Sequence, residues 1–107
     1  MENRLLVAFV QEVDARAVSE ALRSAGLRFT RLASAGGFLG LPSSTFLLAL
    51  DAAAVPAAVA VFREACVARD VEVPLVLTER LRDWRERVVR HGGATILVVD
   101  LAELIRV

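Results

Sequence analysis

The sequence LLVAFV, residues 5–10, decides the fold, because it is a short and almost continuous apolar run between Arg4 and Gln11. Such a run is typical of a central strand that is covered on both sides. After it, Asp14 can cap a helix whose apolar residues recur at helical spacing, and Gly26 stands where a C′ glycine would end that helix. The chain is therefore predicted to begin with a strand followed by a helix.

A second strand is predicted over residues 27–33, which begin with an alternation of apolar and polar residues. Leu27 and Phe29 belong to one face of this strand, and Arg28 and Thr30 belong to the other. The two polar side chains are therefore expected to point the same way.

Two further strands and one further helix complete the predicted order. A third strand is expected at residues 45–50, and the last one at residues 94–99. After the third strand, an apolar stripe predicts a second helix with Pro56 in its first turn. The residues of this stripe are Val55, Val59, Phe62 and Cys66. Residues 71–77 are a candidate extended segment at a sheet edge, because they contain Pro74.

The order strand, helix, strand, strand, helix, strand predicts an α+β fold of ferredoxin-like βαββαβ topology, with an antiparallel sheet and two helices on one face. We expect one domain over residues 1–107, because the chain is too short for two separate cores. Apolar residues make up 56% of the sequence and the mean hydropathy is +0.55. Other copies of the chain are therefore expected to cover part of this apolar surface.

Charge and segment length exclude several classes of partner. Thirteen basic and thirteen acidic residues give a formal net charge of zero, so we expect neither a general nucleic-acid binder nor a protein held on an anionic membrane. The apolar region from Thr45 to Phe62 is broken by Asp51 and Pro56, so no membrane span is predicted. The first residues do not resemble a signal peptide, and we expect a cytoplasmic protein.

Enzymatic and metal chemistry is not predicted. All thirteen basic residues are arginine, tyrosine is absent, and His91 and Cys66 are the single histidine and the single cysteine. His91 stands beside two glycines and is interpreted as a solvated turn residue, while Cys66 is interpreted as a small core residue. Because no metal-ligand spacing occurs either, we expect no catalytic residue, no metal and no cofactor.

Residues 34–44 are predicted to form a long loop, because they are dense in glycine, serine and proline. Gly36 and Gly37 free the backbone to approach an anion. Arg28 and Thr30 offer a guanidinium and a hydroxyl on the strand that leads into this loop. These four residues form a candidate phosphate site.

Phe38 and Leu39 are large apolar residues in this otherwise small and polar loop. Their side chains would suit a nucleobase packed against them. The alternative is that both merely hold the loop against the core, and their spacing alone favours this alternative.

Residues 79–90 are the most charged stretch, with five arginines and three acidic residues, and are interpreted as a solvated surface arm. Trp84 lies in its middle, with Arg82 and Arg85 near it. This tryptophan is a candidate for docking a partner or stacking on a base, and the alternative is that it covers the edge of the core.

Three blocks of the sequence resemble a known family. The blocks RFTRLASAGGFL at 28–39, SSTFL at 43–47 and GGATILV at 92–98 look like the signature blocks of the PII-like cyclic di-AMP receptor proteins. The resemblance covers nearly the whole chain except residues 71–90. It implies a ferredoxin-like subunit, a homotrimer like that of PII signalling proteins, and a ligand site in the cleft between subunits, near the loop 34–44.

The resemblance implies a role for each candidate residue. The polar residues of the second strand would lie near the phosphates or sugar, the paired glycines would shape the loop, and the apolar pair after them would lie against an adenine. The terminal hairpin would add two more glycines. In this order the candidate ligand-binding residues are Arg28 and Thr30, Gly36 and Gly37, Phe38 and Leu39, and Gly92 and Gly93, together with Ser43.

Two places depart from the family pattern. Gly26 stands where the family usually has an asparagine, and Pro42-Ser43 stands in place of a glycine–asparagine pair. Both asparagines are ligand contacts in that family. Losing an amide that reads a base edge costs about 1 to 3 kcal/mol when its buried partner is left unpaired. We therefore expect cyclic di-AMP binding to be weakened, or replaced by that of another nucleotide.

The predicted function is that of a non-enzymatic, trimeric receptor that binds cyclic di-AMP and relays this to a protein target by rearrangement of the loop 34–44. One alternative is a trimeric scaffold that no longer binds a dinucleotide and uses the arm around Trp84 as its contact surface. Another is a receptor of the same fold for a different nucleotide. A hydrolase or metal-tolerance protein is disfavoured, because tyrosine, lysine and clustered ligands are absent.

Overall fold

The structure is a computed structural model of the 107-residue chain, and it describes residues 1–34, 42–66, 69–72, 88–91 and 93–107. The sequence predictions for the loop tip and for the charged arm around Trp84 lie outside these residues. No helix of the described part is long and apolar enough to cross a membrane.

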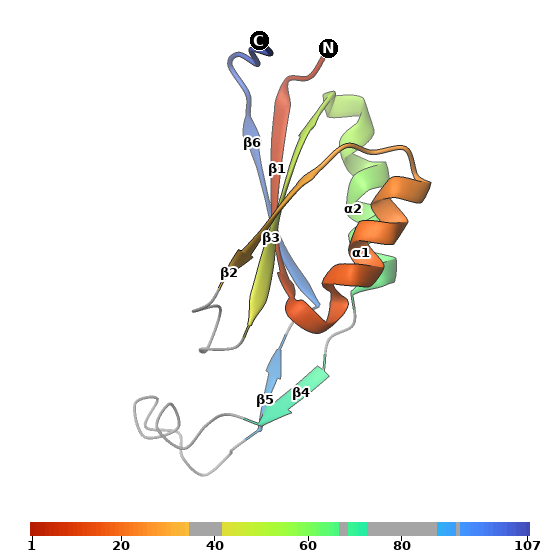
Figure 1. Ribbon diagram of the computed structural model, residues 1–107, viewed down its shortest axis with the longest axis vertical. Coiled ribbons are helices and arrows are strands. Elements are labelled where there is room, and N and C mark those ends of the chain that lie inside the picture. Colours follow the sequence, from red (N-terminus) through yellow and green to blue (C-terminus); the bar gives the residue numbers. More distant parts are fainter. Residues whose placement is uncertain (35–41, 67–68, 73–87, 92) are drawn as a thin grey trace.

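The chain forms an antiparallel sheet in the order β2-β3-β1-β6, and both long helices cover one face of it (Figure 1). A second sheet pairs β4 with β5, and it is inserted between the second helix and the last strand. Without this insertion the order is βαββαβ, so the predicted α+β, ferredoxin-like topology is found. The elements are β1 (Arg4–Gln11), α1 (Glu12–Ser24), β2 (Thr30–Ser34), β3 (Ser43–Leu50), the 3-10 helix η2 (Ala52–Ala54), α2 (Val55–Ala65), β4 (Arg69–Glu72), β5 (Val88–His91) and β6 (Ala94–Asp100).

The core lies between the sheet and the two helices. Alternate residues of β1 and β3 face it, and apolar residues of α1 and α2 pack against them. The buried Phe46 ring of β3 lies 5.6 Å from the Phe29 ring and 5.8 Å from the Phe62 ring, measured between centroids. The fully buried side chains of the core include Leu6, Val18, Leu22, Phe46, Leu48 and Phe62.

The opposite face of the sheet carries apolar side chains that no helix covers. The strand register places Phe9, Leu32 and Leu97 on this open face, with exposed fractions of 43%, 51% and 49%. The prediction that residues 5–10 are covered on both sides is therefore wrong for one copy of the chain. The reason is that β1 belongs to an antiparallel sheet, whose connections leave one face without helices.

The boundaries of α1 confirm one sequence prediction and correct another. Gly26 has a φ of 73°, and the Leu27 N–H donates to the Leu22 carbonyl at 3.0 Å, so the helix ends as predicted with glycine at C′. Asp14 is not the N-cap, because α1 begins at Glu12, directly after β1. Asp14 lies buried in the first turn instead, where a carboxylate suits the positive end of the helix dipole.

Of four further sequence predictions, the structure corrects two and confirms two. The second strand begins at Thr30, not at residue 27. His91 lies in β5 opposite Arg69, not in a turn, because strand pairing and not the following glycines determines its conformation. Pro56 lies in the first turn of α2, and Cys66 is buried, both as predicted.

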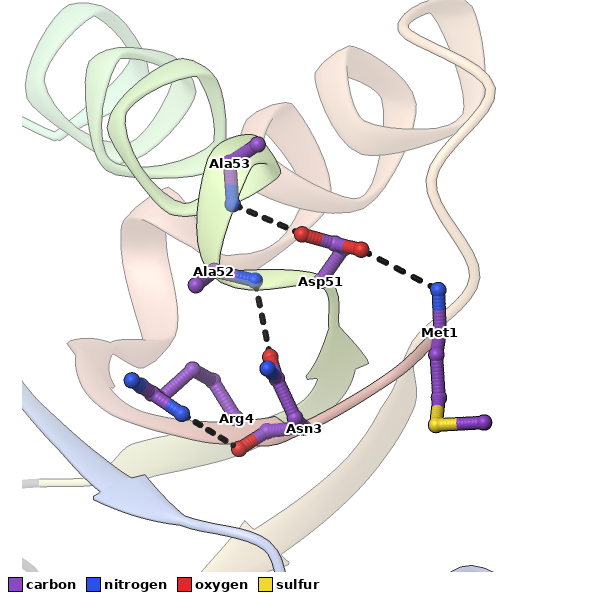
Figure 2. A network of polar contacts seen from close by, with 6 residues as sticks. All are labelled: Met1, Asn3, Arg4, Asp51, Ala52 and Ala53. Atoms are coloured by element: carbon purple, nitrogen blue, oxygen red, sulfur yellow. Dashed lines mark hydrogen bonds and ion pairs between the residues drawn. The ribbon is translucent and has the colours of Figure 1, made fainter.

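The connection from β3 to α2 is held by Asp51 (Figure 2). One carboxylate oxygen accepts from the Ala53 N–H at 2.9 Å, and the other accepts from the Met1 ammonium at 3.1 Å. Asn3 adds a bond from the Ala52 N–H to its side-chain oxygen at 2.9 Å. The Ala53 N–H chiefly, and the Met1 ammonium after it, lower the pKa of Asp51 below 3.8.

Asp51 is predicted to stabilise the fold in its charged form. Because its folded-state pKa is depressed, this contribution is present above the unfolded pKa and is lost as the pH falls through the folded value. The melting temperature of Asp51→Asn should therefore fall below that of the wild type at pH 7, by a few degrees, and the difference should shrink towards pH 2.5.

Asp51→Ala distinguishes the contribution of helix capping to stability from the contribution of the charge. It should melt below Asp51→Asn at every pH, because only asparagine keeps an acceptor for the Ala53 N–H. Equal melting temperatures of the two variants would contradict the capping role.

Candidate functional site

One end of the four-stranded sheet, called the loop end here, gathers several of the predicted site segments. Ser34, the last residue of β2, pairs with Ser43, the first residue of β3. Gln11, the last residue of β1, pairs with Ser43 from the other side. Val10 pairs with Ala94, where β6 begins. The candidate residues Ser43 and Gly93 therefore both lie at the loop end.

Thr30 is the first residue of β2, an edge strand of the sheet, and Arg28 lies two residues before it in the segment that leads into β2. Leu27 and Phe29 pack against the core, whereas Arg28 and Thr30 are exposed. The predicted alternation is therefore confirmed, although only Thr30 belongs to the strand. The Phe29 ring, in contact with Phe46, turns its two polar neighbours away from the helices.

Two nearby arginines have different surroundings. The Arg28 guanidinium makes no ion pair or hydrogen bond with any residue that the structure describes. The Arg31 guanidinium instead donates to Glu12 and to Ser44. Of these two arginines, Arg28 is therefore the one whose donors are not used within the described part of the chain, and its role in binding an anion stays a prediction.

The contacts of Arg31 were not predicted from the sequence. Arg31 lies 19 positions from Glu12 and 13 positions from Ser44. Contacts over such separations follow no helical or strand period. The opposite charges of Arg31 and Glu12 were the only signal, and the sequence offers many such pairs.

Gly93 lies at the opposite edge of the sheet, just before β6, and has a packing role. A Cβ at this position would lie 3.2 Å from the backbone carbon and oxygen of Cys66, which is the C-cap residue of α2. Such distances are shorter than ordinary van der Waals contacts. The glycine therefore permits a close approach of β6 to the end of α2.

A hollow lies beside Gly93, between α2 and β6. Most of the residues that line it are apolar, and the Arg63 side chain adds one positive charge. The lining residues are Val59, Phe62, Arg63, Cys66, Gly93, Ala94 and Ile96. The hollow therefore includes Gly93, the described candidate ligand-binding residue of the terminal hairpin.

The remaining candidate residues fall outside the described part of the chain; they are Gly36, Gly37, Phe38, Leu39 and Gly92. Within the residues that are described, no group of three or more histidine, cysteine, aspartate or glutamate side chains is arranged to hold a metal.

One copy of the chain does not bring Thr30 and Gly93 together. Thr30 aligns with Leu97 through the register of the four strands, and Gly93 lies four positions before Leu97. Strand spacing and rise then separate Thr30 from Gly93 by roughly 19 Å, from one edge of the sheet to the other. A compact ligand in contact with both positions would need them from different copies.

The comparisons with known proteins give a family and a solved structure. The model of the family described as "Cyclic-di-AMP receptor" matches residues 3–107. The chain belongs to this family. The sequence resemblance to PII-like cyclic di-AMP receptors is thereby confirmed.

A similar structure exists as well. A crystal structure of a functionally unknown protein from Pediococcus pentosaceus ATCC 25745 has a TM-score of 0.74 and 27% sequence identity, with 100% of this chain and 99% of that chain covered. The comparison with curated proteins gives no match.

Membership of the cyclic-di-AMP receptor family supports a nucleotide-binding receptor role. The family is one of receptors and not of enzymes.

Gly93→Ala is predicted to lower the stability of the fold. The added methyl group must displace the Cys66 backbone by a few tenths of an ångström, and overpacking of this kind costs about 1 to 3 kcal/mol. Thermal melting would measure the loss. Gly26→Asn is the control, because its Cβ meets nothing within 4 Å and asparagine tolerates a positive φ. A melting temperature of Gly93→Ala at or above that of Gly26→Asn would contradict the packing role.

Proposed function

We propose that the protein is a cytoplasmic receptor that binds cyclic di-AMP between the subunits of a homotrimer and relays binding to a protein target through rearrangement of its loops. The observation that carries this proposal is the family match over residues 3–107. The role is binding alone, without catalysis, metal or cofactor.

The distribution of the site over two sheet edges supports a position between subunits. Arg28 and Thr30 lie on the β2 edge, and Gly93 lies on the β6 edge. If the β2 edge of one copy meets the β6 edge of the next, each contact joins two different surfaces. Such contacts form a closed ring when the rotation permits, and three copies would give three equal sites.

The open face of the sheet supports assembly of the same kind. Its apolar residues Phe9, Leu32 and Leu97 are each about half exposed in one copy. Contiguous apolar surface of this type is typical of faces that other chains cover. In a trimer these faces would meet around the symmetry axis.

Within this site we assign roles to the candidate residues. Arg28 and Thr30 bind the phosphates or sugar, Phe38 and Leu39 lie against an adenine, and Ser43 contributes a hydroxyl at the loop end. The four glycines allow the backbone to approach the ligand; they are Gly36, Gly37, Gly92 and Gly93. Gly93 combines this role with its packing against Cys66.

A second candidate function follows from the two missing amides. Gly26 offers no side chain, and Ser43 is shorter than asparagine and carries a hydroxyl instead of an amide. A ligand whose base edge needs those amides would bind less tightly, by about 1 to 3 kcal/mol for each unpaired group. The alternative is therefore a receptor for a different nucleotide, or a scaffold without a nucleotide, on the same trimer.

The trimer is predicted to depend on the open face. Light scattering should give three times the 11.6 kDa subunit mass for the wild type and the subunit mass for Leu97→Glu, because a carboxylate cannot be buried among apolar side chains without a partner. Val13→Glu is the matched control, since Val13 is an apolar residue with 67% exposure on α1. A monomeric wild type, or a trimeric Leu97→Glu, would contradict this assembly.

Arg28→Ala is predicted to weaken ligand binding by about 1.5 to 3 kcal/mol, roughly ten- to a hundredfold, because it removes a charge-assisted hydrogen bond. Calorimetric titration with cyclic di-AMP, cyclic di-GMP and ATP would measure the affinity and identify the ligand. Arg16→Ala, which removes an exposed arginine from α1, serves as the control. Unchanged affinity in folded Arg28→Ala would place the anion elsewhere, and a wild type that binds none of the three would favour the scaffold.

A further inference from the structure

Three side chains at the loop end form a closed polar network, called the Glu12 network here. Arg31 donates from Nη2 to Glu12 Oε1 and from Nε to Ser44 Oγ, the latter at 3.1 Å. Ser44 Oγ donates in turn to Glu12 Oε2 at 2.7 Å. Each of the three residues therefore contacts the other two.

The network joins three elements that otherwise meet only through the backbone or the core. Glu12 is the first residue of α1, Arg31 belongs to β2, and Ser44 belongs to β3. Ser44 is fully buried, while the side chains of Arg31 and Glu12 are 36% and 41% exposed. A charge-assisted pair closed by a buried hydroxyl is more strongly fixed than an ion pair in open solvent.

The edge strand β2 has few other side-chain attachments to the body of the fold. On the helix side of the sheet it carries only Arg31 and Ala33, which pair with Phe46 and Ser44. The apolar anchor, Phe29, lies just before the strand. Arg31 therefore supplies the fixed side chain within the strand itself.

Phe29 and Arg31 stand on either side of Thr30, and both point to the helix side of the sheet. Thr30 and Arg28, which alternate with them, point the other way and are exposed. The Phe29–Phe46 contact and the Glu12 network, both on the helix side of the sheet, therefore determine the positions of Arg28 and Thr30 on its other side.

We propose that Glu12, Arg31 and Ser44 are positioning residues of the ligand site, which hold the Arg28–Thr30 edge in its binding geometry without contacting the ligand. This inference rests on the proposed function. We assign Arg31 to positioning and not to the anion itself, because Glu12 neutralises its charge and two of its five N–H donors, one on Nε and one on Nη2, are held within the network.

The test compares the two possible roles of Arg31 through its partner Glu12. If the network positions the edge, Glu12→Gln and Ser44→Ala should each weaken cyclic di-AMP binding about five- to tenfold, mainly through faster dissociation. If Arg31 were a ligand contact restrained by Glu12, Glu12→Gln would release its charge and tighten binding. Tighter binding would therefore overturn the proposal.

A charge exchange provides the rescue. The double variant Glu12→Arg/Arg31→Glu restores the ion pair, and Ser44 Oγ is able both to donate and to accept. It should bind within about twofold of the wild type, whereas Arg31→Glu alone should bind far less tightly. A double variant as weak as Arg31→Glu would overturn the positioning role.

Two controls separate positioning from stability. Arg16→Met breaks the exposed Arg16–Glu20 ion pair of α1, which is 3.2 Å long, and should leave the affinity unchanged. Val18→Ala lowers stability from the fully buried core and should also leave it unchanged. If Val18→Ala weakens binding as much as Ser44→Ala at the same loss of melting temperature, the proposal is wrong.

Titration of the wild type separates the positioning role from the proposed function. A wild type that binds cyclic di-AMP while the network variants bind equally well overturns the positioning role and leaves the proposed function standing. A wild type that does not bind cyclic di-AMP overturns the proposed ligand and, with it, the positioning role.

Discussion

The contact of the buried Phe46 ring with Phe29 and Phe62 is the interaction on which the rest of the structure depends. It joins the segment before β2, the strand β3 and the helix α2 through rings whose centroids lie 5.6 and 5.8 Å apart. Arg23 covers the outer side of Phe29, with its Cζ 5.5 Å from the ring centroid. Because Phe29 is held from both sides, the exposed position of its neighbour Arg28 follows from core packing.

If the ligand binds between subunits, as proposed, the same packing links assembly of the subunits to ligand binding. Both long helices cover one face of the sheet, so its opposite face and its β2 and β6 edges remain for contact with other chains. Arg28 lies just before the β2 edge strand and Gly93 just before the β6 edge strand. A ligand that needs both edges binds only to the assembled protein, and it stabilises the assembly by the free energy of its own binding.

Local patterns in the sequence predicted those parts of the fold and site that depend on neighbouring residues. The end of α1 at Gly26 and the inward direction of Phe29 are of this kind, because backbone conformation and alternation determine them. The network of Glu12, Arg31 and Ser44 was not predictable, because its members lie 13 to 32 positions apart and meet only after the sheet has formed.

The two departures from the family pattern, Gly26 and Ser43, lie at positions where the backbone does not depend on the side chain. Gly26 keeps the positive φ that ends α1, and a Cβ there would meet nothing within 4 Å, so asparagine and glycine both suit the helix end. Ser43 begins β3, where its backbone pairs with both neighbouring strands whatever its side chain. Neither position carries core packing. Ligand preference can therefore change at these residues while the subunit keeps its fold.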